Sequence, residues 1–438
     1  MSGFRGSGID GEGTPKMGSV HSYWEATAPK RRPLSQAHGS ISCDVAVVGA
    51  GLTGLSAAYH LRQHHVEVAV FEGRSVGWGA SGRTGAQVNT GFRPSFRTIE
   101  QRWGSEAAAE ALSMSVNAVK LVSQLVTTLD MVCDFTPSGF IRAAVSPHAL
   151  DVLRDEQRFM EDHGYRTEIL HTEGLQEELR SPMYVGGLLE TLPSQIHPLK
   201  FVQELARVCQ ETGVRLFENS PVVDLSKGFE ASSPIVLRTP DATITADAVV
   251  LATNAYTTPF GSRAIRRITR SVLPVGSFII VTNPLAELPT LIPHNRSVAD
   301  TGTLTTHFRP LSDNRLLLGG RIGPSDSDSS MGQLLQEKLV RLFPSLGSVT
   351  VSYQWGGYVG VTRDFLPRLG RRDGIYYALG CNGHGVALGT YFGRYLAYRI
   401  VNPDAPQCWL ERLGLPTMPS QRMGVQALSW YSKWSRNR

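Results

Sequence analysis

The sequence predicts a mixed α/β fold of two domains, and three observations lead to that prediction. The chain has 438 residues, which is more than one hydrophobic core usually supports. An apolar run at 44–48 leads into a glycine-rich turn and a helical pattern at 55–63, as expected for a buried parallel strand and its crossover helix. Alternating or continuous apolar residues at 265–283 and 304–320 indicate strands of a second, mainly antiparallel sheet.

The first turn has the pattern GxGxxG and indicates a dinucleotide. Its first glycine allows the tight turn, its second lets the backbone approach a pyrophosphate, and its third lets the helix pack on the strand. A second apolar run at 66–71 ends at Glu72, where an acid can bind ribose hydroxyls. The strand, the glycines, the helix, the second strand and the acid follow one another at the expected spacing. A dinucleotide-binding turn explains this order better than an ordinary strand and helix whose glycines serve packing alone. The predicted cofactor-binding residues here are Gly49, Ala50, Gly51, Leu52, Thr53, Gly54 and Glu72.

A second glycine-rich block follows at 73–88, where a simple nicotinamide-binding unit would continue to another helix. So many glycines suit a backbone that wraps closely around a large flat ligand. A flexible surface loop is the alternative, and it fits less well directly after a dinucleotide-binding turn. The candidate cofactor-binding residues in this block are Gly79, Ala80, Ser81, Gly82, Arg83 and Gln87.

Composition excludes several classes of protein. The chain is 41% hydrophobic and 18% charged, with a net charge of +5 and no long basic block, so charge gives no reason to expect nucleic acid as a partner. Its five cysteines form no CxxC pair and show no metal-ligand spacing, which favours free thiols in a reducing compartment and no metal site. Residues 1–20 are expected to be disordered. No stretch is long and apolar enough for a transmembrane segment, so we expect a cytoplasmic enzyme.

Three stretches together resemble a known family. GAGLTGLSAAYHL, Glu72 and GWGASGRTGAQVN resemble the FAD-binding signature of the D-amino-acid oxidase superfamily. The segment SYWEAT ahead of ISCDVAVVGAG is similar to the γ-glutamylputrescine oxidase branch. The resemblance implies a discontinuous Rossmann-like FAD-binding domain at 41–97, 196–262 and 350–402. It also implies an α+β substrate domain at 98–195 and 263–349 and a C-terminal extension at 403–438.

The middle of the chain is expected to connect these two domains. Residues 98–130 predict a long helix pair, 140–145 a strand, 149–163 a helix, and 199–211 another helix. The resemblance implies that backbone around Val223 lies beside the adenine. A buried strand at 248–252 precedes Thr253 and Asn254, and the small residues at its end suit close approach to the dinucleotide. The tail at 423–438 mixes aromatic and basic residues, and we expect it to dock on the protein's own surface rather than on a membrane.

A third glycine turn, GCNGHG, lies between a strand at 375–379 and a helix that runs to about residue 400. Such a turn directs backbone N–H groups and a positive dipole end toward an electron-rich partner. The resemblance implies that this partner is the pyrimidine side of the flavin ring. The turn therefore favours FAD over NAD, with Gly383, His384 and Gly385 as cofactor-binding candidates.

Amine oxidation by a flavin needs a neutral substrate nitrogen and a dry pocket more than it needs acid and base groups. Aromatic walls suit that task, so Tyr256, Phe308, Trp355 and Tyr358 are candidates to surround the substrate, each with a plain core aromatic as its alternative. His384 is a candidate to deprotonate the amine, or else only orders its turn. We assign His384, Trp355 and Tyr358 as catalytic candidates. A substrate carboxylate would bind an arginine, and the candidates are Arg83, Arg93, Arg309, Arg321 and Arg363, with Arg309 grouped with Tyr256 and Phe308 as substrate-binding.

Two departures from sarcosine oxidases limit what the resemblance implies. Some of those enzymes attach FAD through a cysteine in the segment that corresponds to 355–363, and this chain has none there, so we expect noncovalent FAD. They also place an oxygen-activating lysine on the strand that corresponds to 315–320, where this chain has leucines. Molecular oxygen and another electron acceptor therefore both stay open.

The sequence thus predicts an FAD-dependent oxidoreductase that acts on C–N bonds. It would oxidise a primary or secondary amine, with a γ-glutamylated polyamine as the leading substrate, to an imine that hydrolyses to an aldehyde or keto acid. An amino-acid or N-methylamino-acid oxidase or dehydrogenase is the alternative in the same class. A flavin-bearing enzyme of RNA modification and a noncatalytic dinucleotide sensor are weaker alternatives.

Overall fold

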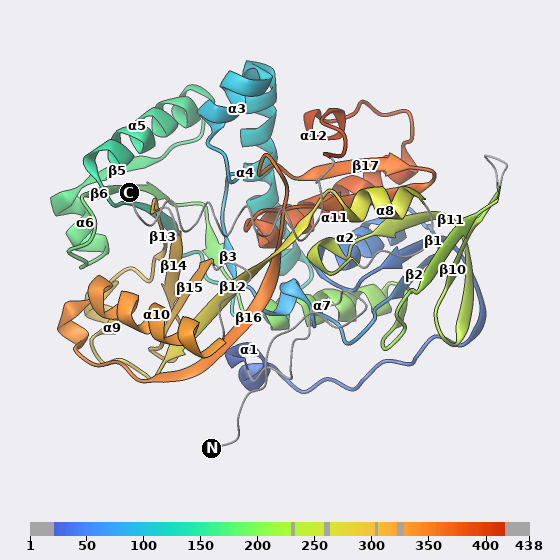
Figure 1. Cartoon of the computed structure of the whole chain (residues 1–438), viewed down its shortest axis with the longest axis horizontal. Coiled ribbons are helices and arrows are strands. Elements are labelled where there is room, and N and C mark those ends of the chain that lie inside the picture. The colour runs from blue at the N-terminus through green and yellow to red at the C-terminus, as the bar shows by residue number, and fades with distance from the viewer. Residues whose placement is uncertain (1–21, 229–232, 258–262, 303–304, 322–327, 417–438) are drawn as a thin grey trace.

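The computed structural model describes residues 22–228, 233–257, 263–302, 305–321 and 328–416. Two large sheets form the two halves of the molecule, with most helices packed around them (Figure 1). The mixed α/β class expected from the sequence is confirmed. The expected disordered tail at 1–20 and the aromatic and basic tail at 423–438 lie outside the described residues.

The first sheet is built around the strand that precedes the first glycine turn. Its order is β17-β18-β11-β1-β2-β8, and the contacts of β1 with β11 and β2, of β11 with β18 and of β2 with β8 are parallel. The strands are β1 (Gly39–Val48), β2 (Val68–Phe71), β8 (Arg215–Phe217), β9 (Asp224–Lys227), β10 (Ile235–Arg238), β11 (Ala242–Leu251), β17 (Arg368–Arg372) and β18 (Ile375–Leu379).

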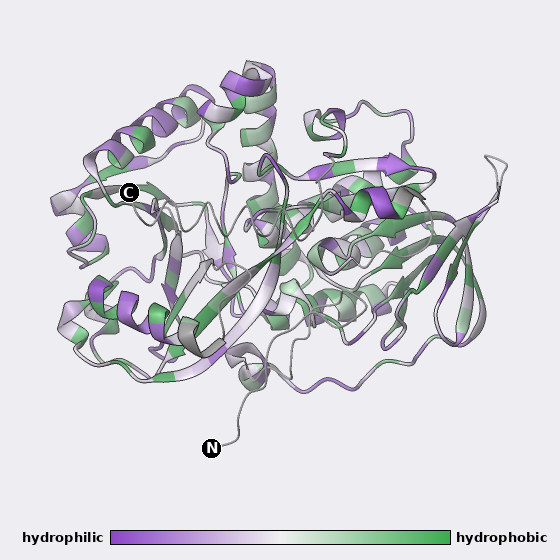
Figure 2. Ribbon diagram, in the orientation of Figure 1, coloured by the Kyte–Doolittle hydropathy of each residue, from purple (hydrophilic) through white to green (hydrophobic). Residues whose placement is uncertain are grey.

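Both faces of this sheet are buried, which explains the unbroken apolar run in β1. Val45 and Val47 belong to a core shared with α2, α7, α11 and α4, whereas Ala46 and Val48 belong to a core shared with α8. Figure 2 shows the strands of this sheet as largely hydrophobic. The helices are α2 (Leu52–Arg62), α4 (Ser105–Thr128), α7 (Pro198–Glu211), α8 (Arg263–Thr269) and α11 (Gly385–Val401).

The second sheet is antiparallel except where β13 pairs with β4. Its order is β16-β12-β15-β14-β13-β4-β6-β5. Its outer face packs on α6, α9 and α10, and its inner face looks toward the first sheet. The elements are β4 (Phe140–Ala144), β5 (Glu168–His171), β6 (Gly186–Glu190), β12 (Leu273–Thr282), β13 (Ser297–Asp300), β14 (Thr306–Pro310), β15 (Leu316–Arg321), β16 (Val351–Val361), α6 (Thr172–Glu178), α9 (Leu288–Leu291) and α10 (Asp328–Leu342).

Shorter elements connect the two halves. The expected helix pair is present as α3 and α4, and α4 packs against α11 of the first half. A two-stranded sheet of β3 and β7 joins the loop after Glu72 to the chain that returns from the second sheet. The remaining elements are α1 (Tyr23–Thr27), α3 (Phe96–Trp103), α5 (Pro147–Asp162), α12 (Trp409–Arg412), β3 (Gln87–Val88), β7 (Ser194–Gln195) and the 3-10 turns η1 (Ala80–Gly82), η2 (Asn254–Tyr256) and η3 (Pro344–Leu346).

Two segments differ from the sequence-based expectation. Residues 263–269 form the helix α8 rather than a strand, because Ile265 and Ile268 lie on one helical face and pack on the first sheet. Strand β16 pairs with β12 along most of its length, so 351–361 lies in the second sheet, whereas the sequence analysis grouped it with the segment at 350–402. After its first passage through the second sheet in β4, β5 and β6, the chain enters that sheet again near residue 273 and leaves it near residue 361.

Candidate active site

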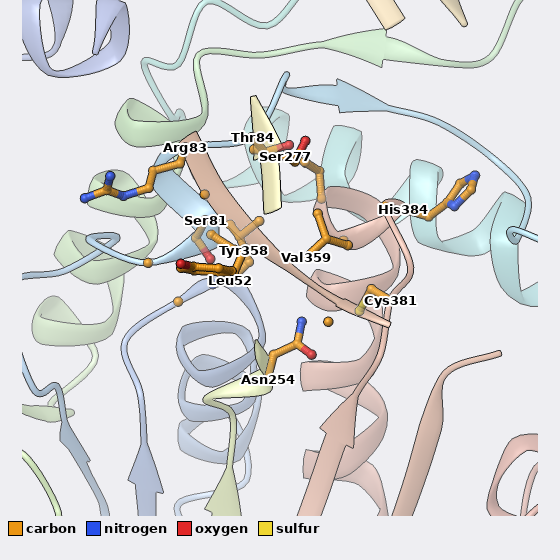
Figure 3. Close-up of a pocket in the computed structure, with 18 of the residues that line it drawn as sticks. Leu52, Ser81, Arg83, Thr84, Asn254, Ser277, Tyr358, Val359, Cys381 and His384 are labelled. Atoms are coloured by element: carbon orange, nitrogen blue, oxygen red, sulfur yellow. Dashed lines mark hydrogen bonds between the residues drawn. The ribbon is translucent and has the colours of Figure 1, made fainter. Parts of the chain in front are cut away.

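A cavity of about 940 Å³ lies between the first glycine turn and the inner face of the second sheet. Its walls include residues of 48–53, 71–95, 219–222, 252–257, 357–360 and 381–386, together with residues on β4, α5, β12, β13 and β14. Figure 3 shows Leu52 and Ser81 from the N-terminal blocks in the same close-up as Asn254, Tyr358 and His384. The glycine-rich blocks identified in the sequence analysis thus all line this one cavity.

The first glycine turn has the close contacts that its pattern predicts. Gly49 has φ +103°, and a Cβ there would lie 3.2 Å from the carbonyl oxygen of Ala252. A Cβ on Gly54 would lie 2.0 Å from the carbonyl oxygen of Gly49, so the first turn of α2 can approach the strand only because this residue is glycine. The turn and the helix N-terminus consequently form one wall of the cavity.

Glu72 follows β2 and lines the cavity. Its Oε2 accepts a hydrogen bond from the backbone N–H of Ala50 at 2.8 Å, and its Oε1 accepts one from Arg74 at 2.9 Å. Burial raises the pKa of this carboxyl, and the two backbone donors oppose that shift. Each oxygen keeps a further lone pair for a ligand hydroxyl.

The second glycine block is tied to the start of α2. The hydroxyl oxygen of Ser81 accepts a hydrogen bond from the backbone N–H of Leu52 at 3.0 Å. A Cβ on Gly82 would lie 2.3 Å from the carbonyl oxygen of Gly77, so the turn at η1 requires glycine there. The block therefore folds back over the first glycine turn.

Two tryptophans bind this loop on the side that faces away from the cavity. Trp24 Nε1 donates to the carbonyl oxygen of Thr84 at 3.0 Å, and Trp355 Nε1 donates to the carbonyl oxygen of Arg83 at 2.9 Å. Both indoles are buried, and their ring centroids lie 6.1 Å apart. We call Trp24 and Trp355 the indole pair. Trp355, a catalytic candidate from the sequence, lies outside the cavity lining and contacts the rear of the loop.

Arg83 and Gln87 line the cavity, but protein groups already bind their side chains. The Nε of Arg83 donates to the carbonyl oxygen of Trp78 at 2.8 Å, and its guanidinium lies 5.0 Å from the centre of the Trp78 ring. The amide nitrogen of Gln87 donates to the carbonyl oxygens of Val298 and Phe308, both at 3.2 Å. Gln87 therefore links the loop to the inner face of the second sheet.

Asn254 connects the middle of the chain to the third glycine turn. Its Oδ1 accepts a hydrogen bond from the backbone N–H of Gly380 at 2.9 Å. A Cβ on Gly360 would lie 2.1 Å from the same oxygen, so β16 passes close to the amide of Asn254. The backbone N–H of Asn382 also donates to the carbonyl oxygen of Gly360 at 3.2 Å. These contacts bring β16, η2 and the start of α11 to one side of the cavity.

The third glycine turn opens α11, with His384 as its N-cap. Gly383, His384 and Gly385 all line the cavity, so a positive helix end faces it. Cys381 lies in the same wall, and burial raises the pKa of its thiol to about 12. That cysteine is consequently a neutral thiol near neutral pH.

Tyr256 and Tyr358 form an aromatic corner of the cavity. Their ring centroids lie 5.9 Å apart in an edge-to-face arrangement, and the hydroxyl oxygen of Tyr256 accepts a hydrogen bond from the backbone N–H of Tyr358 at 3.2 Å. Burial raises the pKa of Tyr256, so its phenol stays protonated. Both residues line the cavity.

The structure brings most of the nominated residues to this one cavity. Those in its lining are Gly49, Ala50, Gly51, Leu52, Thr53, Glu72, Gly79, Ala80, Ser81, Arg83, Gln87, Arg93, Thr253, Asn254, Tyr256, Tyr358, Gly383, His384 and Gly385. Gly54 and Gly82 are not in the lining themselves, but they lie next to it and allow the close backbone contacts described above. Arg363 is not part of the lining, and the side chain of Arg321 lies outside the described part of the chain.

Phe308 and Arg309 are placed away from the cavity. Phe308 points to the outer face of the second sheet, where its ring centroid lies 5.8 Å from that of Phe343. Arg309 is buried 5.3 Å above the Trp24 ring and donates to the carbonyl oxygen of Ile196 at 2.8 Å. Because side chains alternate along a strand, His307 rather than Phe308 lines the cavity.

Val223 itself is not in the cavity lining, although its neighbours are. Its side chain is 53% exposed and its backbone N–H donates to the carbonyl oxygen of Arg238 at 2.8 Å, while Pro221 and Val222 line the cavity beside it. The backbone around Val223 therefore borders the cavity, and its place beside the adenine stays a prediction. The sequence pattern identified only a strand here and carried no signal for the register.

Sequence reasoning also missed several residues of the site. Thr84, Ser277 and His307 line the cavity, and Trp24 holds the loop from outside it. Thr84 lies inside the second glycine block and could have been included by position. Ser277 and His307 lie on strands whose inward face only the sheet register reveals.

Over the described residues, no helix is long and apolar enough to span a lipid bilayer. Within the same part of the chain, no group of three or more His, Cys, Asp and Glu side chains is arranged to hold a metal ion. All five cysteines are buried and unbonded to one another, so the expected free thiols are present.

Comparison with known proteins identifies the family. Residues 44–399 match the model of the DAO family, "FAD dependent oxidoreductase". The chain is 34% identical over 390 residues to the gamma-glutamylputrescine oxidoreductase of Escherichia coli, covering 88% of this chain and 89% of that protein. It is 33% identical over 415 residues to the probable oxidoreductase OrdL of Haemophilus influenzae, covering 92% of this chain and 94% of that one.

Solved structures show the same fold. The glycine oxidase of Geobacillus kaustophilus superposes with a TM-score of 0.71 at 22% identity, covering 88% of this chain and 100% of that one. The L-proline dehydrogenase of P. horikoshii also gives a TM-score of 0.71, at 20% identity and with 85% and 96% of the two chains covered. The matched family model and the two relatives above 30% identity establish the assignment: this chain belongs to the DAO family of FAD-dependent oxidoreductases.

Proposed function

We propose that this enzyme oxidises a primary or secondary amine to an imine, with a γ-glutamylated polyamine as the leading substrate. The observation that supports this most is the 34% identity to a gamma-glutamylputrescine oxidoreductase along 88% of the chain. Water then hydrolyses the imine to an aldehyde or keto acid and releases ammonia or the smaller amine. Molecular oxygen or another acceptor removes the electrons.

The residues of the cavity fit FAD. Gly49 and Gly54 let backbone approach closely at the N-terminus of α2, which suits a pyrophosphate. We assign Glu72 to the ribose hydroxyls, because its oxygens have lone pairs beyond the two backbone hydrogen bonds. We assign the N-terminus of α11, at Gly385, to the electron-rich side of the flavin ring. The neutral thiol of Cys381 and the lack of cysteine at 355–363 favour noncovalent binding.

Bound FAD supplies a two-electron acceptor for the hydride that leaves the α-carbon of the amine. The protein's part is to hold a neutral amine in a dry pocket. Tyr256 and Tyr358 supply the aromatic corner that excludes water, and burial, which raises the pKa of Tyr256, keeps that phenol protonated. His384 lines the same cavity and is our candidate to accept the proton of the substrate ammonium.

An amino-acid or N-methylamino-acid oxidase is the second candidate. The glycine oxidase of Geobacillus kaustophilus is 27% identical to this chain over 366 residues. Such a substrate requires a cation for its carboxylate, and Arg93 and Arg142 line the cavity. The two candidates differ in the length of substrate that each would accept.

The test is anaerobic reduction of the purified FAD-bound protein by a panel of amines. We expect γ-glutamylputrescine to bleach the flavin absorbance and to yield one aldehyde equivalent per flavin reduced. Glycine and sarcosine should bleach it far more slowly. Rapid bleaching by glycine or sarcosine alone would support the second candidate, and no bleaching by any amine would reject both. The rate at which colour returns in air then measures oxygen as an acceptor.

A further inference from the structure

The end of the second glycine block, at 83–87, crosses the inner face of the second sheet. The carbonyl oxygen of Arg83 accepts a hydrogen bond at 2.9 Å from the indole of Trp355 on β16, which is the edge strand of that sheet. Further along the segment, a Cβ on Gly85 would lie 2.7 Å from the Nε2 atom of His307 on β14. The segment therefore runs from the edge of the sheet toward its middle strands.

The side chain of Gln87 makes the last of these contacts and binds two strands at once. Its Nε2 donates to the carbonyl oxygens of Val298 on β13 and Phe308 on β14, both at 3.2 Å. Val298 and Phe308 lie directly opposite each other in the antiparallel ladder. A primary amide has two N–H groups, so each carbonyl can receive its own donor. Gln87 is thus fixed to one residue pair of the second sheet.

The next residue pair of the same ladder belongs to the cavity wall. Ala299 on β13 and His307 on β14 are opposite each other, and both line the cavity together with Gln87. The two carbonyls that Gln87 binds are therefore one residue away from this wall in each strand. A shift of the Gln87 amide would change the distance between the loop and the wall.

We propose that Gln87 is a positioning residue that sets the separation between the FAD-binding loop and the cavity wall on β13 and β14. The proposal rests on the amine oxidation proposed above, with FAD held by the glycine blocks and the amine held between them and the second sheet. Reacting atoms must lie about 3–3.5 Å apart, and a misplacement of about 1 Å can cost about a hundredfold in rate. Trp355 fixes one end of 83–87 to the sheet and Gln87 fixes the other, so both contacts maintain the separation.

Amide hydrogen exchange tests this connection in the native protein without any turnover. Adding FAD to the apoprotein should slow exchange in peptides from the loop and, through Gln87, in peptides from β13 and β14. Peptides from β5, at the far edge of the same sheet, should be unchanged. If exchange in β13 and β14 does not respond to FAD, the proposal is overturned before any variant is made.

Gln87→Met keeps the length of the side chain and removes both donors, and Gln176→Met is its matched control. Gln176 on α6 is also half-buried and also donates through Nε2 to a backbone carbonyl, that of Ser181 at 3.1 Å, but it is not part of the cavity lining. Gln87→Met should lose the FAD-dependent protection of β13 and β14 and keep that of the loop, which the indole pair still binds. Gln176→Met should keep both. Native protection of β13 and β14 in Gln87→Met would refute the role of its amide.

The rate of flavin reduction at saturating amine is the second measurement. We expect Gln87→Met to lower this limiting rate about tenfold, while the Kd for FAD and the amine concentration for half-maximal rate each change less than about twofold. Gln176→Met should change none of the three. A Kd for FAD that rises about tenfold at an unchanged limiting rate would make Gln87 a ligand of FAD instead and would overturn the proposal.

The two measurements separate this proposal from the proposed oxidation. The expected exchange in the native protein and in Gln87→Met, without flavin reduction by any amine, would keep the role of Gln87 and reject amine oxidation. Equal limiting rates of reduction in the native protein and in Gln87→Met would keep the oxidation and reject the positioning role. No response of β13 and β14 to FAD and no reduction by any amine would reject both.

Discussion

Replacing the indole pair by phenylalanine, singly and together, tests how the second glycine block is held. Trp24→Phe and Trp355→Phe each remove one N–H donor and keep an aromatic ring. The carbonyl oxygens of Thr84 and Arg83 then lose their partners behind the loop. An unsatisfied buried acceptor costs about 1–3 kcal/mol. Part of that cost falls on FAD binding, because Arg83 and Thr84 line the cavity.

We expect each single variant to weaken FAD binding by roughly tenfold, which corresponds to about 1.4 kcal/mol. The double variant should lose less FAD affinity than the product of the two single fold-losses. The two carbonyls belong to consecutive residues, so a change at one also displaces the other. The assay is titration of the apoprotein with FAD, followed by quenching of flavin fluorescence. Thermal unfolding of each apoprotein measures the loss of stability separately.

Trp409→Phe is the matched control. Trp409 and Trp355 are each 2% exposed, so the two substitutions lose similar packing. The Nε1 of Trp409 has no hydrogen-bond partner among the described residues. Trp409→Phe should therefore lower stability while leaving FAD affinity nearly unchanged. If Trp24→Phe and Trp355→Phe weaken FAD binding no more than this control does, the indole pair does not position the loop.

Three further outcomes follow from single contacts. Gly54→Ala should abolish FAD uptake, measured by absorbance, since the added Cβ would meet a backbone oxygen at 2.0 Å. Gly174→Ala is the control: the nearest atom to its added Cβ lies 3.8 Å away, so this variant should fold and bind FAD normally. Burial lowers the pKa of His197 to about 4, so only the unfolded state takes up its proton as the pH falls from about 6.5. Native stability should therefore drop by up to roughly 3 kcal/mol between pH 7 and pH 4.5 in urea unfolding, relative to His197→Gln; an equal pH dependence in both would contradict the assignment. Tyr256→Phe leaves the N–H of Tyr358 without its acceptor, which should cost about 1–3 kcal/mol of stability. It should also slow flavin reduction by amines several-fold, as measured by stopped-flow absorbance.

The sequence was sufficient for those parts of the fold whose signal is local. Glycines with steric requirements, such as Gly54 and Gly82, lie where their motifs predict, because the chain there must turn or approach closely whatever surrounds it. The strand at 375–379 and the helix at 198–211 also follow from local periodicity.

The remainder of the site depends on register and long-range pairing, which periodicity does not specify. On β14 a shift of one residue exchanges Phe308 for His307 in the cavity wall, and β16 joins the second sheet through its pairing with β12. Trp355 has the aromatic character of a substrate wall but contacts the loop from behind, because Trp24, far away in sequence, completes that packing. Arg142 on β4 and Glu156 on α5 likewise meet in the cavity lining through long-range packing and leave no local pattern in the sequence.

The central claim is that this cavity holds one FAD noncovalently. The most direct measurement is the visible spectrum of the purified protein before and after acid precipitation, with the released flavin identified by chromatography. We predict a yellow protein that releases one FAD per chain into the supernatant. A colourless protein that fails to take up added FAD would contradict the account, and flavin that stays with the precipitate would contradict noncovalent binding.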